Sequence, residues 1–167
     1  LFDTMTALRC AMVKLVPMQQ VDFEIYLEDD IHKYAPEHIR VGNWEASEAL
    51  EKSGKEHEQL LPEGLESKNQ YLLTVVDEDT STKVGILWIN IEGGRAFIYD
   101  FIINEDLRGK GYGKQALIAI DEKLKSMNVR SIGLHVFGDN IPAQEPYKKM
   151  GYQITDIHMK KILKQEN

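Results

Sequence analysis

A glycine-rich, basic segment at residues 108–114 reads Arg-Gly-Lys-Gly-Tyr-Gly-Lys and separates an expected strand from an expected helix. Loop glycines let backbone N–H groups converge on an anion, and a helix N-terminus carries about half a positive charge. Arg108, Lys110 and Lys114 add cations to a protein that is acidic as a whole. No Ser, Thr, Asp or Asn follows Asp106 at the helix entrance, so a phosphate group could satisfy the first N–H groups. The segment predicts a phosphate-bearing ligand, with a solvated glycine-rich turn as the alternative.

The spacing of the glycines argues against two common phosphate-binding loops. A nucleotide-triphosphate loop needs a glycine where Arg108 stands and a Ser or Thr where Gln115 stands. A dinucleotide-binding fingerprint needs a glycine where Lys114 stands, and no following strand ends in an acidic residue at the required distance. Kinase-like and dinucleotide-dependent enzymes are therefore disfavoured.

Two motifs together carry a family resemblance. Arg108, Gly111 and Gly113 form Arg-x-x-Gly-x-Gly, and residues 140–152 contain Asn-x-x-Ala-x-x-x-Tyr-x-Lys-x-Gly-Tyr. In this order, and on the expected elements, the motifs resemble the pyrophosphate loop and a later segment of the GCN5-related N-acetyltransferase (GNAT) family. The similarity extends over residues 70–160, whereas the earlier helices match the family in layout only.

The resemblance implies an α/β GNAT fold, with a central mixed, mostly antiparallel sheet flanked by helices, and transfer of an acetyl group from acetyl-CoA to an amine. It implies no metal. By position, backbone N–H groups of the loop would hold the CoA pyrophosphate, two residues of the preceding strand would pair with the pantetheine arm, and Asn140 would help to hold CoA. The predicted cofactor-binding residues are Ile102, Ile103, Arg108, Gly109, Lys110, Gly111, Tyr112, Gly113, Lys114 and Asn140.

Two residues are candidates for proton transfer. The resemblance implies that Tyr147 faces the thioester sulfur and protonates the departing thiolate, although Pro142 and Pro146 put its direction in question. Asp100 lies in the middle of an expected strand beside the cofactor loop and could take a proton from the amine, because an ammonium group cannot attack a thioester. A structural, hydrogen-bonded aspartate is an equal reading, and Glu92 is the alternative base.

No nucleophile for a covalent mechanism is evident, so direct attack of the amine in a ternary complex is expected. Cys10 is the only cysteine, which rules out an internal disulfide and a cysteine-rich zinc site, and the histidines show no metal-ligand spacing as a set. A non-catalytic acyl-CoA-binding or sensing module is the alternative function, because the prolines near Tyr147 could have cost the protein its acid.

Periodicity predicts a single domain over residues 12–167, with residues 1–11 as an N-terminal extension. Segments with apolar residues at helical spacing precede and follow three segments that are rich in β-branched and aromatic residues and joined by polar turns, which predicts an antiparallel meander. A strand–helix–strand series near the glycines predicts parallel pairing through a right-handed crossover. The chain is expected to stop its first helix at Ala35-Pro36. Expected strands are residues 13–16, 71–76, 84–91, 96–103, 132–136 and 152–162, and expected helices are residues 23–34, 46–61, 117–127 and 142–150.

Charge and composition narrow the partners. The chain has 20 basic and 27 acidic residues, and its net charge of −7 argues against nucleic acid and anionic membranes as partners. The acid-rich segment Glu24, Glu28, Asp29 and Asp30 predicts a cationic acceptor, either a small molecule or a peptide amine. A single cysteine, with no apolar run approaching the roughly 20 residues that cross a bilayer, predicts a cytoplasmic protein. A homodimer is compatible with the sequence.

Overall fold

The computed structural model describes residues 12–161 and residue 163. The predicted extension over residues 1–11, including Cys10, lies outside these described residues. The chain forms two compact units, one ending at Leu134 and the other beginning at His135. That the units make a single domain stays a prediction. Within the described part of the chain, each helix is too short or too polar to cross a membrane.

The first unit is built on a five-stranded sheet. Its strands lie in the order β1 (Val13–Pro17), β2 (Gln70–Asp77), β3 (Lys83–Glu92), β4 (Arg95–Ile103) and β5 (Ser131–Leu134). The first four pair antiparallel, and β5 pairs parallel to β4. Gly93 and Gly94 have φ of 57° and 72°, which lets two residues close the hairpin between β3 and β4. The predicted meander, parallel crossover and mixed sheet are confirmed.

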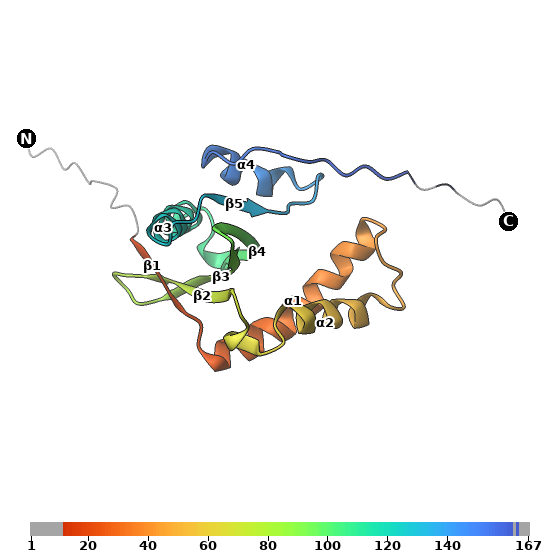
Figure 1. Ribbon diagram of the computed structural model, residues 1–167, viewed down its shortest axis with the longest axis horizontal. Coiled ribbons are helices and arrows are strands. Elements are labelled where there is room, and N and C mark those ends of the chain that lie inside the picture. Colours follow the sequence, from red (N-terminus) through yellow and green to blue (C-terminus); the bar gives the residue numbers. More distant parts are fainter. Residues whose placement is uncertain (1–11, 162, 164–167) are drawn as a thin grey trace, which may run out of the picture. The chain divides into compact units, whose positions relative to one another are not determined.

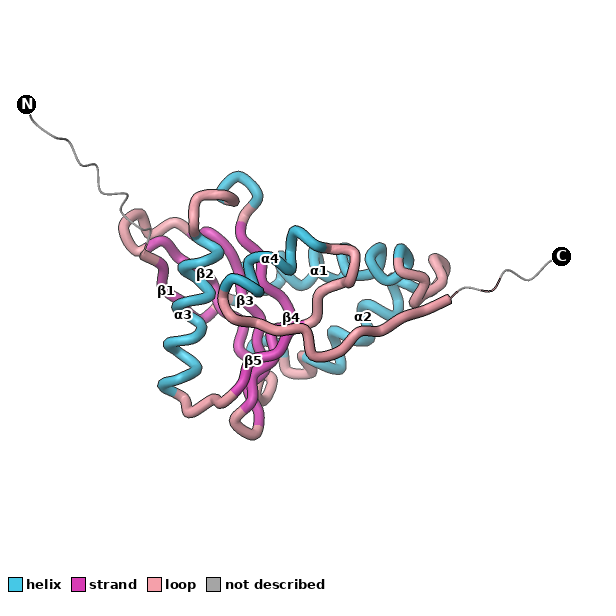
Figure 2. The backbone as a smooth tube through the Cα atoms, turned by 90° about the horizontal axis from the view of Figure 1, so that it is seen from above, coloured by secondary structure: helices cyan, strands magenta, loops and turns pink. Residues whose placement is uncertain are grey.

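Helices cover both faces of this sheet. Helices α1 (Gln20–Arg40) and α2 (Ala49–Leu60) lie on one face, and α3 (Tyr112–Ser126) lies on the other (Figure 1). Phe23 and Tyr26 of α1 pack with Trp88 of β3, whereas Ala116 of α3 packs with Val75 of β2. Figure 2 shows α3 running alongside β1. Two apolar layers therefore hold β3 and β4 in the middle of the unit.

Helix α1 does not end where the sequence predicted. It continues through Pro36 to Arg40, although a proline inside a helix removes a hydrogen bond and costs about 3 kcal/mol. Aromatic rings hold the last turn: the His38 ring stacks on Trp44 with centroids 4.0 Å apart and lies 4.3 Å from the Tyr34 ring. Tertiary packing thus offsets the local cost, which the sequence pattern alone does not reveal.

The second unit contains helix α4 (Ile141–Lys149), close to the helix predicted there. The predicted strand over residues 152–162 is wrong for its described part, because residues 152–161 have no regular secondary structure. The apolar alternation changes phase between Ile154 and Ile157, and the carboxylate of Asp156 accepts the N–H of Ile157. Both isoleucines are exposed, so this segment buries no apolar face that would fix a strand.

Candidate active site

Strand β4 has a free edge in its second half. The β4–β5 ladder runs from Arg95 opposite Ser131 to Ile98 opposite Leu134 and stops there. Among the described residues, no strand pairs with residues 99–103 on that side. This stretch of β4 can therefore receive an extended ligand as if it were another strand.

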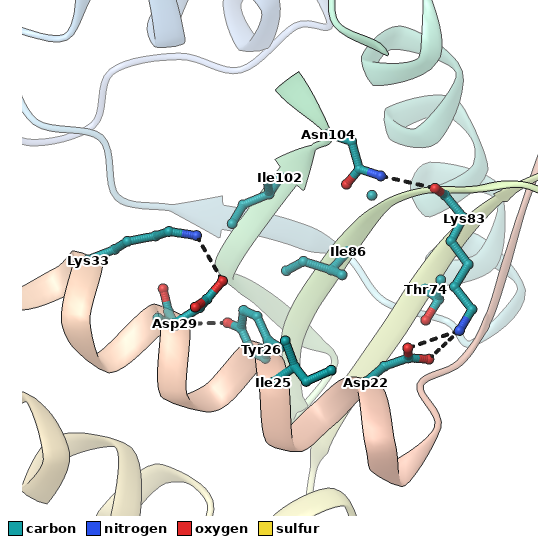
Figure 3. A pocket seen from close by; sticks show the side chains of 12 residues that line it. Asp22, Ile25, Tyr26, Asp29, Lys33, Thr74, Lys83, Ile86, Ile102 and Asn104 are labelled. Carbon is teal, nitrogen blue, oxygen red and sulfur yellow. Dashed lines mark hydrogen bonds and ion pairs between the residues drawn. The ribbon is translucent and has the colours of Figure 1, made fainter. Parts of the chain in front are cut away.

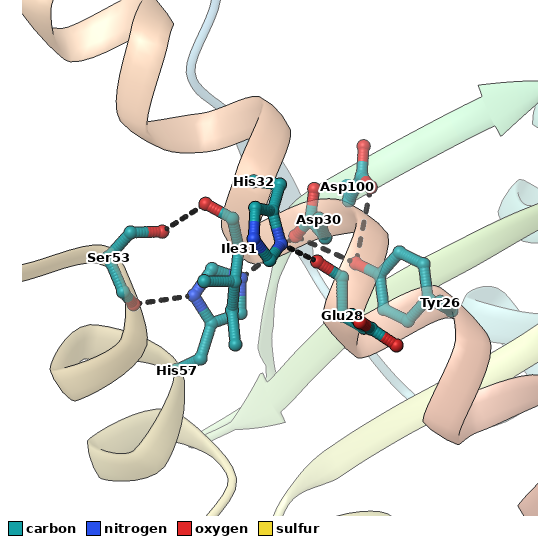
Figure 4. A network of polar contacts seen from close by, with 8 residues as sticks. All are labelled: Tyr26, Glu28, Asp30, Ile31, His32, Ser53, His57 and Asp100. Atoms are coloured by element: carbon teal, nitrogen blue, oxygen red, sulfur yellow. Dashed lines mark hydrogen bonds and ion pairs between the residues drawn. The ribbon is translucent and has the colours of Figure 1, made fainter. Parts of the chain in front are cut away.

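A bulge in β4 precedes the free edge. Trp88 of β3 lies opposite Asp100 and Ile89 lies opposite Ile98, so Tyr99 is an extra residue in β4. Bulges of this kind re-aim side chains and are frequent beside active sites. The bulge resets the direction of the residues that follow, and the carboxylate of Asp100 faces α1 (Figure 4).

The backbone direction of the free edge follows from alternation. The N–H of Asn104 donates to the Val84 carbonyl of β3 at 2.9 Å, so the backbone of Ile102 also faces β3. The backbone groups of Phe101 and Ile103 face the free edge, and the Ile103 carbonyl accepts from Arg108 Nε at 3.0 Å. Of the two predicted pantetheine residues, Ile103 keeps its backbone on this edge, and Phe101 joins it in place of Ile102.

The predicted cofactor loop lies between β4 and α3, after a short 3-10 helix at Glu105–Leu107. Gly109 and Gly111 have φ of 74° and 92°, in the left-handed region, and a Cβ atom at either position would meet no atom within 4 Å. Both glycines are therefore required by backbone conformation, and the surface above them is open. Gly111 is the N-cap of α3, and no side chain caps the helix. The N–H groups of Gly113 and Lys114 thus stand at an open helix N-terminus.

Tyr112 anchors this loop to the rest of the sheet. Its hydroxyl donates to Asp77 Oδ2 at 2.7 Å, and Asp77 Oδ1 accepts the N–H groups of Asp79 and Thr80 at 2.9 Å each. The hydrogen bond from Tyr112 lowers the pKa of Asp77, and the same bond raises the pKa of Tyr112. The side chain of Tyr112 is therefore committed to the β2–β3 turn, and its backbone is the part that faces the loop.

Asp100 belongs to a network of polar side chains between β4, α1 and α2 (Figure 4). The Tyr26 hydroxyl lies 3.1 Å from Asp100 Oδ2 and 3.2 Å from Asp30 Oδ2. Asp30 Oδ2 lies 2.9 Å from His57 Nε2, and His57 Nδ1 lies 2.8 Å from the Ser53 carbonyl. Tyr26 and His57 are buried. The network places the candidate base on a chain of groups that can each hold or pass a proton.

The electrostatics of this network favour a proton on Asp100 near neutral pH. Burial raises the pKa of Asp100 to about 7, and the negative charge of Asp30 adds to the effect. Burial also raises the pKa of Tyr26, followed by the charges of Asp100 and Asp30. Burial alone would lower the pKa of His57, but the hydrogen bonds with Asp30 and Ser53 outweigh it and raise that pKa. A carboxyl poised near pH 7 is suited to general base catalysis.

A pocket of about 280 Å³ lies next to this network, between α1 and strands β2 to β4 (Figure 3). Tyr26, Asp30 and Lys33 line one wall, and Ile86 and Ile102 line the other. Two ion pairs flank it: Lys83 with Asp22 at 2.7 Å, and Lys33 with Asp29 at 3.5 Å. Of the predicted acid-rich segment, Asp29 and Asp30 line the pocket, whereas Glu24 and Glu28 do not.

The remaining predicted residues lie elsewhere. Glu92, at the end of β3, accepts from Asn69 Nδ2 at 3.2 Å in an exposed hairpin. Asn140 caps α4, with its Oδ1 accepting from the Ala143 N–H at 3.3 Å, and the ring of Tyr147 contacts that of Tyr152. Both Asn140 and Tyr147 belong to the second unit, so their roles at the cofactor stay predictions. Among the described residues, no His, Cys, Asp and Glu side chains are grouped to hold a metal ion.

Sequence reasoning missed Tyr26 and His57 as members of the site, and it named Asp30 only as part of the acid-rich segment. The available signal was weak: Tyr26 and Asp30 lie one helical turn apart, and His57 lies in the apolar stripe of the second helix. A polar residue in an apolar stripe indicates a buried partner but does not identify it.

The sequence and the fold of this chain are similar to those of known proteins. A model of the acetyltransferase (GNAT) family matches residues 34–152. The N-acetyltransferase YycN of Bacillus subtilis is 40% identical to this chain, over 90% of this chain and 99% of its own length. The N-acetyltransferase YdgE of the same organism is 35% identical, over 89% of this chain and 97% of its own length. The crystal structure of YycN superposes on this chain with a TM-score of 0.86 at 39% sequence identity. The superposition covers 92% of this chain and 100% of YycN.

Proposed function

The chain belongs to the GNAT family of acetyltransferases, and from this we propose that it transfers the acetyl group of acetyl-CoA directly to a primary amine, with Asp100 as general base. The family and the fold predicted from the two motifs are confirmed, and with them the class of enzyme, an acetyl-CoA-dependent N-acetyltransferase. The observation that carries the proposal is the free edge of β4 at residues 99–103, which includes Asp100 and is followed along the chain, after residues 104–111, by the uncapped N-terminus of α3.

The described residues fit acetyl-CoA. The N–H groups of Gly111, Gly113 and Lys114 would hold the pyrophosphate at the open helix N-terminus, where the helix dipole favours an anion. The backbone groups of Phe101 and Ile103 would pair with the amides of the pantetheine arm. The motif around Asn140 is the basis for proposing that this residue helps to hold CoA.

Asp100 supplies what the amine needs to react. An amine with a pKa near 10.4 costs about 4 to 5 kcal/mol to deprotonate at pH 7, and a positioned base offsets part of this cost. The Asp100 carboxylate takes the proton from the ammonium group, and the nitrogen then forms a bond to the thioester carbonyl carbon. The carbon–sulfur bond breaks, the nitrogen gives up its second proton to solvent, and the thiolate leaves with a proton that we assign to Tyr147, whose phenolate then takes a proton from solvent.

The acceptor is proposed to be a cationic amine, acetylated in the cytoplasm. Asp22, Asp29 and Asp30 give the pocket beside the network an acidic wall, and Lys33 and Lys83 offset only part of that charge. The apolar side chains of Ile25, Ile86 and Ile102 suit the carbon chain of such an amine.

The test is an acceptor panel with detection of the free CoA thiol, applied to Asp100→Asn. Removing the base should lower kcat by about 10²- to 10⁴-fold, with acetyl-CoA affinity unchanged. Glu92→Gln is the matched control, because it alters the other predicted base and should leave kcat close to that of the parent. Equal kcat for Asp100→Asn and parent would refute the role of Asp100. A parent protein that binds acetyl-CoA but turns over no acceptor would instead indicate a sensing module.

A further inference from the structure

The network around Asp100 ends in the contact between the buried His57 and the partly buried Asp30, and the proton transfer proposed above uses neither His57 nor this contact. We propose that the Asp30–His57 pair sets the pH at which Asp100 exchanges its proton, acting through the hydroxyl of Tyr26. These three are positioning residues, since they act on Asp100 rather than on the substrate. The effect on catalysis rests on the proposed function, whereas the coupling itself is a property of the folded chain.

The hydroxyl of Tyr26 lies between two carboxyl groups. Its hydroxyl lies within hydrogen-bond distance of both Asp100 and Asp30 but has a single proton to donate. Both contacts are hydrogen bonds at once only if one of the two carboxyls is protonated and donates to the Tyr26 oxygen. Asp100 therefore meets the negative charge of Asp30 across a single hydroxyl group.

His57 decides which carboxyl keeps the negative charge. The Ser53 carbonyl can only accept, so His57 Nδ1 carries a proton, and Nε2 faces Asp30 Oδ2 at 2.9 Å. A protonated His57 stabilises the Asp30 carboxylate, so the proton near Tyr26 stays on Asp100. Ser53 Oγ donates to the Ile31 carbonyl at 2.8 Å and so fixes α2, which carries His57, against α1.

Other groups facing the network are few. Lys33 of α1 favours the charged form of Asp100, and Glu56 of α2 favours the charged form of His57. The neutral rings of Tyr34 and Trp88 lie with centroids 5.8 Å from the His57 ring. Tyr99 of β4 lies next to Asp100 in sequence, and its ring contacts that of Trp88. Among these groups, only His57 pairs directly with Asp30.

The experiment is an NMR titration of the full chain with ¹³C-labelled aspartate, using Asp100→Asn to assign the Asp100 signal. In His57→Gln the charge of Asp30 is no longer balanced, so Asp100 should hold its proton to a pH about one unit higher. In Asp30→Asn the repelling charge is gone, so the pKa of Asp100 should fall by about one to two units. Glu28→Gln removes an exposed acid from the same helix and should shift nothing.

Double variants test the path of the coupling. His57→Gln should cause no further shift once Asp30 is Asn, and only a smaller shift once Tyr26 is Phe. Equal shifts by His57→Gln with and without the Tyr26 hydroxyl would overturn a path through Tyr26. Asp30→Asn is nearly isosteric, so an unchanged Asp100 titration in this variant would overturn the proposal even if His57→Gln does not fold.

The pH profile of kcat/KM separates this inference from the proposed function. If Asp100 is the base, the acidic limb should move with the NMR titration in each variant, by the same number of pH units. An NMR shift with an unmoved limb would support the coupling but refute Asp100 as the base. An unmoved NMR titration in every variant would refute the coupling, whatever the profile does.

Discussion

In the loop over residues 108–114, the groups offered to a ligand are mainly backbone N–H donors at an exposed helix N-terminus. Around Asp100, the groups are side chains from three elements, and two of them, Tyr26 and His57, are buried. The loop therefore depends on backbone conformation at Gly109 and Gly111, whereas the network depends on the chemical identity of each side chain. Binding and proton transfer should accordingly respond to different substitutions.

The largest effect is expected from a side chain assigned to proton transfer. Tyr147→Phe removes a hydroxyl and keeps the ring, so kcat should fall by about 10²- to 10⁴-fold while acetyl-CoA affinity holds. Steady-state kinetics and calorimetry on the same preparation measure both quantities. Tyr152→Phe makes the same chemical change at the neighbouring ring and serves as the control. A thiolate with a pKa near 8.5 does not strictly need a proton, so an unchanged kcat would mean that water is the acid.

The next effect should appear in binding. Gly111→Glu forces a side chain into the left-handed region at φ 92° and brings a negative charge to the phosphate site, so acetyl-CoA should bind at least about tenfold more weakly. Calorimetry measures the affinity, and kcat at saturating acetyl-CoA should change little. Gly111→Ala separates the two causes, because it keeps the backbone strain without the charge. A folded Gly111→Glu protein that binds as the parent does would contradict the loop assignment.

A further effect concerns the dependence of stability on pH. The pKa of Asp100 is about 7 in the folded chain against an ordinary 3.8, so the folded chain binds this proton more tightly than the unfolded chain does. The stability that the bound proton contributes is fully present below about pH 4 and is lost as the pH rises to about 7. Asp100→Asn removes this loss, so its free energy of unfolding relative to the parent should rise between these limits, by up to about 4 kcal/mol, because the pKa differs by about three units and each unit is worth about 1.4 kcal/mol. Urea unfolding across the pH range measures it. Parallel curves for parent and variant would show that Asp100 ionises normally.

The smallest effect is expected from salt. If the acceptor is cationic, its KM should rise about two- to threefold from low to physiological ionic strength, since salt screens attraction to exposed carboxylates. The KM for acetyl-CoA in the same assay provides an internal comparison. A preference for neutral or anionic acceptors across the panel would refute a cationic substrate.

The sequence predicted the parts of the molecule that local patterns determine. Runs of β-branched and aromatic residues between polar turns located β2, β3 and β4, and glycine spacing located the loop that is predicted to bind the cofactor. The extension of α1 past Pro36 escaped prediction because rings from Trp44 and His38 stabilise it across a loop. The strand expected after Tyr152 failed because apolar periodicity without a buried face does not fix a strand.

The polar network around Asp100 could not be predicted from the sequence for a related reason. Tyr26, His57 and Asp100 come from three elements and meet only after α1 and α2 pack on the sheet. The bulge at Tyr99, which re-aims Asp100, arises from a register shift between two strands and leaves no local pattern in either. Asp100 could be nominated from the sequence, but its partners could not.

The hydrogen bond between Tyr112 and Asp77 has a practical consequence for anyone redesigning this protein. Asp77 also closes the turn after β2, so that turn and the first residue of α3 are mechanically linked although 35 positions separate them. Mutant libraries that aim to change the preference for the acyl donor can therefore vary residues at two places: the loop itself and the surface turn over residues 78–82. A reporter peptide inserted into that turn should respond to changes in the loop that is predicted to bind the donor, so the turn is a starting point for a biosensor. For the same reason, an affinity tag inserted there would be expected to disturb the loop.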